Sequence, residues 1–187
     1  LNVDTISGYN WINANTNADD DNGHGTHVAG TIAALANNGK GLAGVAPGAT
    51  IVPLKVLDSS GSGSLSNAAS AVNYVLKTLT QRKISFSNAV VNLSLGAQDI
   101  NTTYTSLDTA IRNAANQGLR FAIAAGNSGQ DVDGFTPART GDHPNVYTVS
   151  AVDNTYTMAP FSNWDQITSS DLTDNVDFSA PGVKVVS

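Results

Sequence analysis

Two histidines at the start of an apolar segment have the spacing of a possible catalytic site. Residues 22–30 read NGHGTHVAG and place His24 and His27 three positions apart. An Asn-Gly turn precedes His24, and the glycines on either side of it leave room for a substrate or another backbone segment. This arrangement suits one exposed imidazole that acts as a catalytic base. A metal pair and a helix-capping histidine are alternatives, although a zinc-protease helix spaces its histidines by four with a glutamate between them.

A second candidate lies at the end of a predicted strand. Residues 124–129 read AAGNSG, so a run of small residues delivers Asn127 to the edge of a sheet. Its side-chain amide could donate a hydrogen bond to a developing oxyanion, an interaction worth about 3–4 kcal/mol of the barrier. The alternative is an ordinary Asn-Ser-Gly turn.

Two further segments could hold an extended peptide between them. Residues 90–96 read VVNLSLG, and residues 61–63 read GSG within a loop rich in glycine and serine that we expect to be flexible. A strand that ends in Ser-Leu-Gly leaves backbone donors and acceptors with which a peptide could pair as an added strand. The alternative is a strand end and a loose loop with no ligand.

The elements that must position these residues alternate along the chain. Predicted helices cover residues 26–36, 65–79 and 106–117, predicted strands cover residues 49–57, 89–95, 120–125 and 146–152, and residues 183–187 are strand-like. Such alternation is typical of βαβ units, so we expect an α/β fold with a doubly wound, mainly parallel sheet flanked by helices. Ligand sites in these folds gather at the carboxyl ends of strands, where the candidate segments lie.

The composition excludes several classes of function. The 187 residues are enough for one domain with a core, and 41% are hydrophobic while 13% are charged. With a net charge of −6 and no cluster of Lys and Arg, we expect no nucleic-acid partner. No apolar run is long enough to span a membrane, and without cysteine no disulfide can form. A nucleotide-binding domain is a poor alternative, because the chain lacks a Gly-x-x-x-x-Gly-Lys-Ser/Thr segment.

Six blocks in one order resemble a known family. HGTHVAGTIAA, GVAPGA, VVNLSLG, AAGNSG, FSN and SAPG follow one another between about residue 8 and residue 186. Together they resemble the subtilisin-like serine peptidases (subtilases). The resemblance implies a subtilisin-like α/β fold and a serine endopeptidase that cleaves peptide bonds through a Ser-His-Asp triad. It also implies polypeptide substrates, secretion or an extracellular location, an N-terminal propeptide and a monomeric state.

The resemblance assigns roles residue by residue. His24 matches the general base of the triad, and Asn127 matches the amide donor of the oxyanion hole. His27 matches a structural position. The residues that match the backbone segments holding the substrate are Gly61, Ser62, Gly63, Ser94, Leu95 and Gly96, and those that match the wall of the specificity pocket are Ala124 and Gly126.

Structural calcium is implied at two places. The first is the loop after the histidine helix, with ligands from Leu35, Asn37 (or Asn38), Gly39 and Gly41. The second combines carbonyl groups before a strand with an aspartate ahead of the APG turn, with ligands from Pro144, Val146 and Asp177. Carbonyl and carboxylate oxygens are the ligands that this cation prefers. The alternative for Asp177 is that it only caps a turn.

Two members of the triad have no match in the chain. The family carries its aspartate in Asp-Ser/Thr-Gly, and Asp4 does not qualify because Ile6 stands where the glycine is required. The nucleophile lies in Gly-Thr-Ser, which does not occur. We therefore expect residues 1–187 to be one partial peptidase domain, truncated at both ends and inactive by itself. The alternative is a peptide-binding pseudopeptidase whose complete chain lacks a triad member.

Overall fold

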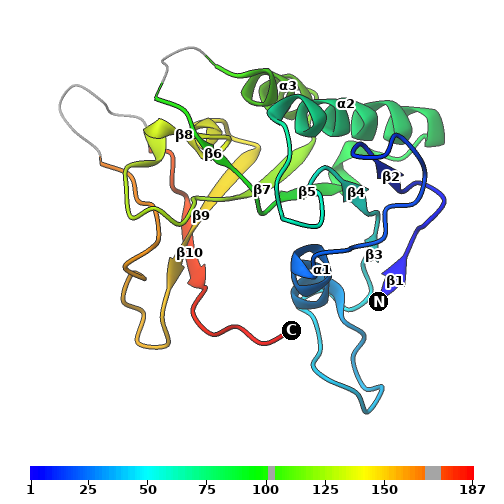
Figure 1. Cartoon of the computed structure of the whole chain (residues 1–187), viewed down its shortest axis with the longest axis horizontal. Helices are drawn as coiled ribbons and strands as arrows, with labels where there is room; N and C mark the ends of the chain where they lie inside the picture. Colours follow the sequence, from blue (N-terminus) through cyan, green and yellow to red (C-terminus); the bar gives the residue numbers. More distant parts are fainter. Residues whose placement is uncertain (101–103, 167–173) are drawn as a thin grey trace. The chain divides into compact units, whose positions relative to one another are not determined.

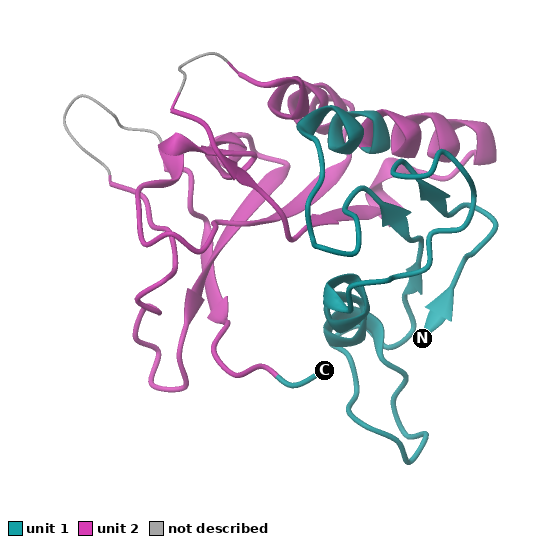
Figure 2. Ribbon diagram, viewed as in Figure 1, with its two compact units in different colours: residues 1–71, 186–187 teal, residues 72–185 magenta. Residues whose placement is uncertain are grey.

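The structure is a computed structural model that describes residues 1–100, 104–166 and 174–187 (Figure 1). The chain divides into two compact units (Figure 2). The first unit comprises Leu1–Ala71 with Val186–Ser187, and the second comprises Val72–Val185. The division into two units does not test whether residues 1–187 form a single domain, which stays a prediction. No helix among the described residues is both long and apolar enough to cross a bilayer.

The second unit is built on a four-stranded parallel sheet. Its strands lie in the order β10 (Phe178–Pro181), β9 (Val146–Val152), β7 (Arg120–Ala124) and β5 (Val90–Leu93). All three neighbouring pairs are parallel, which confirms the mainly parallel α/β sheet expected from the alternation of elements. Because the strands run the same way, their carboxyl ends meet at one edge, and this edge carries the predicted site segments of the second unit.

Two helices belong wholly or partly to this unit. The helix α3 (Ser106–Asn116) packs against β7 and starts with a capping box formed by Thr105 and Asp108 (Figure 1). The helix α2 (Leu65–Arg82) starts in the first unit and continues into the second. The predicted apolar stripe of α3 is confirmed, since all of its members are buried: Leu107, Ala110, Ile111, Ala114 and Ala115. The sheet itself also contributes fully buried side chains, among them Phe121, Ile123 and Val146.

The first unit holds α1 (His24–Ala33) and two short parallel pairs. Strand β1 (Asn2–Val3) pairs with β3 (Thr50–Ile51), and β2 (Tyr9–Asn10) pairs with β4 (Leu54–Lys55). The prediction of one continuous strand over residues 49–57 was therefore wrong. Pro53 has no N–H to donate to a ladder, so the segment splits there and its halves pair with different strands.

Other element boundaries also differ from the predictions. The helix α1 begins at His24 and ends at Ala33, whereas the prediction covered residues 26–36. It ends early because the chain that follows donates hydrogen bonds to the carbonyl groups of its last turn. Gly44, Val45 and Ala46 donate their N–H groups to the carbonyls of residues 34, 31 and 32. Residues 183–187 form no strand; the edge strand is β10 instead. The remaining short elements are an antiparallel pair, β6 (Ala97–Gln98) with β8 (Phe135–Thr136), and the 3-10 turns Phe86–Asn88, Val132–Gly134 and Ala138–Thr140.

Candidate active site

His24 is the first residue of α1 and is exposed, as the role of an exposed catalytic imidazole requires. Its backbone N–H donates to the side-chain Oδ1 of Asn22 at 3.3 Å. His27 lies three residues further along the same helix and is also exposed. The imidazole of His24 therefore stands at the solvent-facing start of a helix, where a reacting group can reach it.

Asp20 organises the start of this helix. Its Oδ1 accepts hydrogen bonds from the N–H groups of Asn22 (3.0 Å) and Gly23 (2.9 Å), and its Oδ2 accepts from both N–H and Oγ1 of Thr26 (2.7 and 2.6 Å). The hydrogen bond from the Thr26 hydroxyl is the main cause that lowers the pKa of Asp20, and the three backbone N–H groups add to it against a partial desolvation. The sequence signal for this role is an aspartate four residues before His24 and a threonine two after it.

Replacing Asp20 by asparagine should weaken the start of α1 in a pH-dependent way. Because the folded pKa lies below the unfolded value of about 3.9, the carboxylate stabilises the fold above pH 4, and this stability is lost as the pH falls through the folded pKa. We expect Asp20→Asn to lower stability by about 0.5–1 kcal/mol at pH 7, in the range of a lost helix cap. Thermal unfolding of both proteins from pH 7 to pH 2 should show the difference constant down to about pH 4 and shrinking progressively below it. Asp19→Asn, the same charge change one residue away, is the control, and an equal effect there would contradict the assignment.

Asn22 connects the histidine to the predicted substrate loop of the first unit. While its Oδ1 accepts from the N–H of His24, its Nδ2 donates to the carbonyl of Ser59 at 3.0 Å. The loop that carries Gly61, Ser62 and Gly63 is tied together by Asp58, whose Oδ1 accepts from the N–H groups of residues 60 and 62. The expectation of a flexible loop is corrected accordingly, because a carboxylate at its base fixes the turn.

The second unit brings four predicted site residues to one cavity. A hollow of about 370 Å³ lies at the carboxyl ends of β5, β7, β9 and β10. Its lining residues are Asn92, Ser94, residues 122–127, residues 149–151, Phe161, Ser162 and residues 180–182, which include the predicted Ala124, Gly126 and Asn127. The cavity thus joins the end of the proposed peptide-binding strand to the proposed oxyanion donor, at the sheet edge where ligands of α/β folds bind.

Leu95 and Gly96 are not part of that lining. They continue the strand end toward β6, and Gly96 lies so close to β8 that an added Cβ would be 3.0 Å from the carbonyl oxygen of Thr136. The sequence analysis missed Phe161 and Ser162 as cavity residues. Their signal was the FSN block, which it used only to identify the family.

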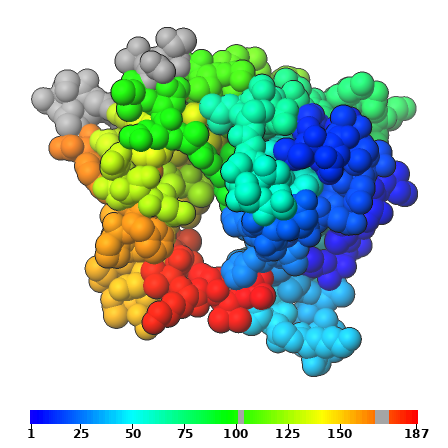
Figure 3. Space-filling view, in the orientation of Figure 1, coloured from blue at the N-terminus to red at the C-terminus, as the bar shows by residue number. Residues whose placement is uncertain are grey.

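The first predicted calcium loop is a tight turn made of exposed residues. Positive φ angles occur at Asn37 (58°), Gly39 (69°) and Gly41 (55°), and residues 35–43 are all exposed, as the light-blue segment of Figure 3 shows. Asn38 uses its Oδ1 to accept from the N–H of Lys40 at 3.0 Å, so Asn37 is the better candidate for a side-chain ligand. The predicted donors are neutral oxygens without a carboxylate, a set that suits weak calcium binding.

The second predicted calcium set lies around the start of β9. Asp177 accepts a hydrogen bond from the N–H of Thr148 through Oδ2 at 2.8 Å and donates its own N–H to the Thr148 carbonyl at 3.0 Å. Desolvation by the surrounding chain is the main cause that raises the pKa of Asp177, and the carboxylate of Asp174 adds to it. One carboxylate oxygen thus binds the backbone of β9 itself, 29 residues away in the sequence, which is not the turn cap of the alternative.

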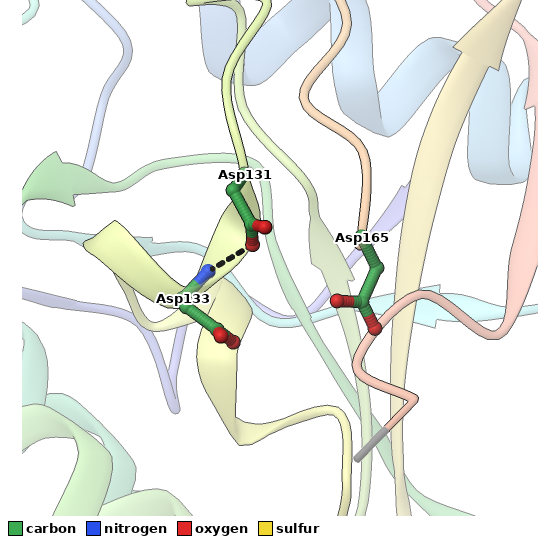
Figure 4. A group of neighbouring side chains, drawn as sticks. All are labelled: Asp131, Asp133 and Asp165. Atoms are coloured by element: carbon green, nitrogen blue, oxygen red, sulfur yellow. Dashed lines mark hydrogen bonds between the residues drawn. The ribbon is translucent and has the colours of Figure 1, made fainter. Parts of the chain in front are cut away.

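A different group of carboxylates is gathered in the second unit. Figure 4 shows Asp131, Asp133 and Asp165, which offer one oxygen each within 4.8 Å of one another. Asn175 donates from Nδ2 to Asp133 at 2.9 Å and from its backbone N–H to Asp165. Oxygen ligands of this kind can hold a hard cation. The carboxylates alone assign none, because acidic side chains also gather without an ion.

Asp4 occupies a local turn rather than a catalytic position. Its Oδ1 accepts from the N–H groups of Ile6 (3.0 Å) and Ser7 (3.1 Å), and its Oδ2 accepts from the Ser7 hydroxyl at 2.5 Å. The carboxylate thus caps the residues that follow it, which agrees with its exclusion as the triad acid.

Comparison with known proteins places the chain in a family. A model of the subtilase family of peptidases matches residues 2–187. The chain is similar to a thermophilic serine proteinase of Bacillus sp. (strain AK1), with 40% identity over 97% of this chain and 40% of that protein. It is also similar to an extracellular serine proteinase of Thermus sp. (strain Rt41A), with 39% identity over 96% of this chain and 37% of that protein.

Solved structures agree. The crystal structure of a cold-adapted subtilisin-like serine proteinase superposes with a TM-score of 0.73 at 34% identity, over 95% of this chain and 55% of that one. This chain spans about 40% of the length of the two curated relatives named above. The superposed structure agrees with the observed sheet and helices, and, with the family model and the two relatives, it shows that the chain belongs to the subtilase family of subtilisin-like serine proteases.

Proposed function

We propose that these residues are part of a serine endopeptidase in which His24 is the general base and Asn127 the oxyanion donor. The observation that carries the proposal is the cavity at the strand ends, which gathers Asn127 with Ser94, Ala124 and Gly126 as a subtilase requires. The nucleophilic serine and the triad aspartate would come from outside residues 1–187, since the chain contains neither Gly-Thr-Ser nor Asp-Ser/Thr-Gly.

The chemistry follows from these roles. His24 takes the proton of the serine hydroxyl as the oxygen attacks the peptide carbonyl, and later gives that proton to the leaving amine. The side-chain amide of Asn127 donates to the oxygen that becomes negative in the tetrahedral intermediate. The backbone of residues 94–96 and 61–63 pairs with the peptide on its acyl side, while Ala124 and Gly126 leave space for a substrate side chain. Water then releases the acyl group from the serine with His24 again acting as base.

The test uses the protein expressed from its complete gene. It should hydrolyse a tetrapeptide amide, and a serine-directed sulfonyl fluoride should abolish the hydrolysis in proportion to the serine modified. Hydrolysis that survives complete sulfonylation would overturn the proposal. A protein that binds the tetrapeptide without cleaving it would support a peptide-binding pseudopeptidase in its place.

We also propose that the protein acts outside the cell, as a monomer, on polypeptide substrates, after release of an N-terminal propeptide. One relative is itself named an extracellular proteinase, and the chain has no cysteine that would need a reducing compartment. Size-exclusion chromatography and N-terminal sequencing of the protein from the culture medium test these points together.

Structural calcium at one or both predicted sites would stabilise the protein without entering the reaction. We expect the melting temperature to be about 5–10 °C higher in millimolar calcium than in the presence of a chelator. This is the shift produced by a ligand at about 100 times its Kd. Asp177→Asn should shrink this increase. Asp153→Asn should leave it unchanged, because the Asp153 carboxylate accepts from groups of its own turn, the N–H and hydroxyl of Thr155 and the N–H of Thr157. Equal melting temperatures with calcium and with chelator would contradict the calcium assignment.

A further inference from the structure

Asn163 is a fully buried polar side chain that contacts the loop carrying Asn127. Its exposed fraction is 0%. Its Nδ2 donates to the carbonyl of Ala125 at 2.9 Å, and its Oδ1 accepts from the N–H groups of Ser128 at 2.9 Å and Gln130 at 3.3 Å. One carboxamide therefore binds the backbone on both sides of Asn127.

Gly126, the residue before Asn127, has no room for a side chain. This residue has a φ of 110°, and a Cβ added to it would lie 2.5 Å from Nδ2 of Asn163. The backbone N–H of Asn163 also donates to the carbonyl of Gly126 at 3.0 Å. The residue immediately before Asn127 is thus held from two directions by the same partner.

The segment that carries Asn163 is itself anchored. The hydroxyl of Ser162 accepts from the N–H of Ala151 in β9 at 2.8 Å and donates to the carbonyl of Asn163 at 3.0 Å. On the other side, Trp164 donates its N–H to the carbonyl of Gln130 at 3.1 Å. The segment that carries the carboxamide is therefore anchored to the sheet independently of the Asn127 loop.

Only an amide meets the demands of this position. The carbonyl of Ala125 needs a donor and the two N–H groups need an acceptor, and the carboxamide that supplies both is fully buried. An aspartate has no donor for Ala125, and an aliphatic side chain would leave the buried carbonyl of Ala125 without a donor and the two N–H groups without this acceptor, which is costly.

We infer that Asn163 is a positioning residue for the oxyanion donor: it sets the backbone on which Asn127 stands, and so the direction of its amide. This inference rests on the proposed function of Asn127. An oxyanion donor works only within about 2.7–3.1 Å of the developing charge, so a loosened loop should cost transition-state stabilisation more than substrate binding.

The experiment is a double-mutant cycle in the protein expressed from its complete gene, with rates expressed per active site titrated. Asn163→Ala should lower kcat about 10- to 100-fold and change KM less than about threefold, a loss smaller than complete removal of an oxyanion donor. In the Asn127→Ala background, Asn163→Ala should lower kcat less than about twofold further, because its effect acts through Asn127. A merely structural role would give two independent losses that multiply, and that result would overturn the inference.

Asn175→Ala is the matched control. Asn175 is also buried (3% exposed) and bridges loops, donating from Nδ2 to Asp133 at 2.9 Å and accepting at Oδ1 from the N–H of Asp142 at 3.1 Å. These hydrogen bonds, and the one from its backbone N–H to Asp165, go to residues outside the 125–130 loop. Its loss should lower the melting temperature but leave kcat per active site within about twofold, since an ordinary buried hydrogen-bond loss affects stability.

A second measurement separates this inference from the proposed function. Hydrogen exchange at the N–H groups of Ser128 and Gln130 should speed up at least 10-fold in Asn163→Ser but not in Asn175→Ala, because the serine side chain is too short to reach both. Unchanged exchange would overturn the positioning role even in an active enzyme. Faster exchange in a protein without peptidase activity would support the loop contact and sink only the proposed function.

Discussion

His24→Ala should lower kcat for a peptide amide by about 10⁶-fold, in the protein expressed from its complete gene. This magnitude is the one measured for the triad histidine of subtilisin itself, a member of the same family, and is carried over from there. The physical reason is that the serine hydroxyl has no other base, so its proton has no acceptor as the bond to the carbonyl forms. Steady-state hydrolysis of a tetrapeptide amide, with the folded fraction determined by circular dichroism, measures it.

His27→Ala is the matched control for this substitution. It changes the same residue type on the same helix, three positions further along, and both side chains are exposed. Its kcat per folded molecule should fall less than about 10-fold, because His27 has no part in the proposed proton transfers. Similar losses in the two variants, or hydrolysis in His24→Ala within 10-fold of the unmodified protein, would exclude His24 as the base.

Asn127→Ala should lower kcat about 10²–10³-fold and leave KM nearly unchanged. This range also comes from subtilisin, where removal of the oxyanion donor was measured, and corresponds to about 3–4 kcal/mol of transition-state stabilisation. The effect falls on kcat because the donor meets a charge that exists only in the transition state and the intermediate. Parallel measurement of kcat and KM on the tetrapeptide amide distinguishes this role from ground-state binding.

Ser128→Ala provides the control for Asn127. Ser128 is the next residue in the same exposed loop, and its contact with Asn163 uses its backbone N–H, which alanine retains. We expect kcat and KM within about twofold of the unmodified protein, as for a surface substitution. If Asn127→Ala raised KM and left kcat unchanged, Asn127 would bind substrate and would not stabilise an oxyanion.

Long periodic elements could be predicted from the sequence because a single physical rule decides them. The stripe of α3 follows from apolar residues every three to four positions, and β9 was expected over the residues that it occupies. Short elements escaped prediction, because β1, β2, β6 and β8 are two residues long and form only when a distant segment supplies the partner. Pro53, which has no N–H to donate to a ladder, lies where the expected strand over residues 49–57 splits.

The candidate site also contains residues that could be predicted from the sequence and residues that could not. His24 and Asn127 could be found from the sequence because their side-chain types and the neighbouring glycines indicate a catalytic base and an amide donor. Asp20 and Asn163 could not, because their partners are backbone N–H and carbonyl groups of loops several to 38 residues away. A residue type shows that a side chain can donate or accept, but only the fold shows to which backbone group it does so. The residues that support a site are therefore harder to predict than the residues that react.

Covalent labelling tests the central claim most directly. The protein expressed from its complete gene is treated with a serine-directed phosphonofluoridate, and the modified residue is located by peptide mass spectrometry. The proposal predicts one modified serine, in a Gly-Thr-Ser segment outside residues 1–187, with labelling slowed at least 10³-fold by His24→Ala, because the hydroxyl then lacks its base. Modification of a serine within residues 1–187, or labelling that proceeds equally fast without His24, would contradict it.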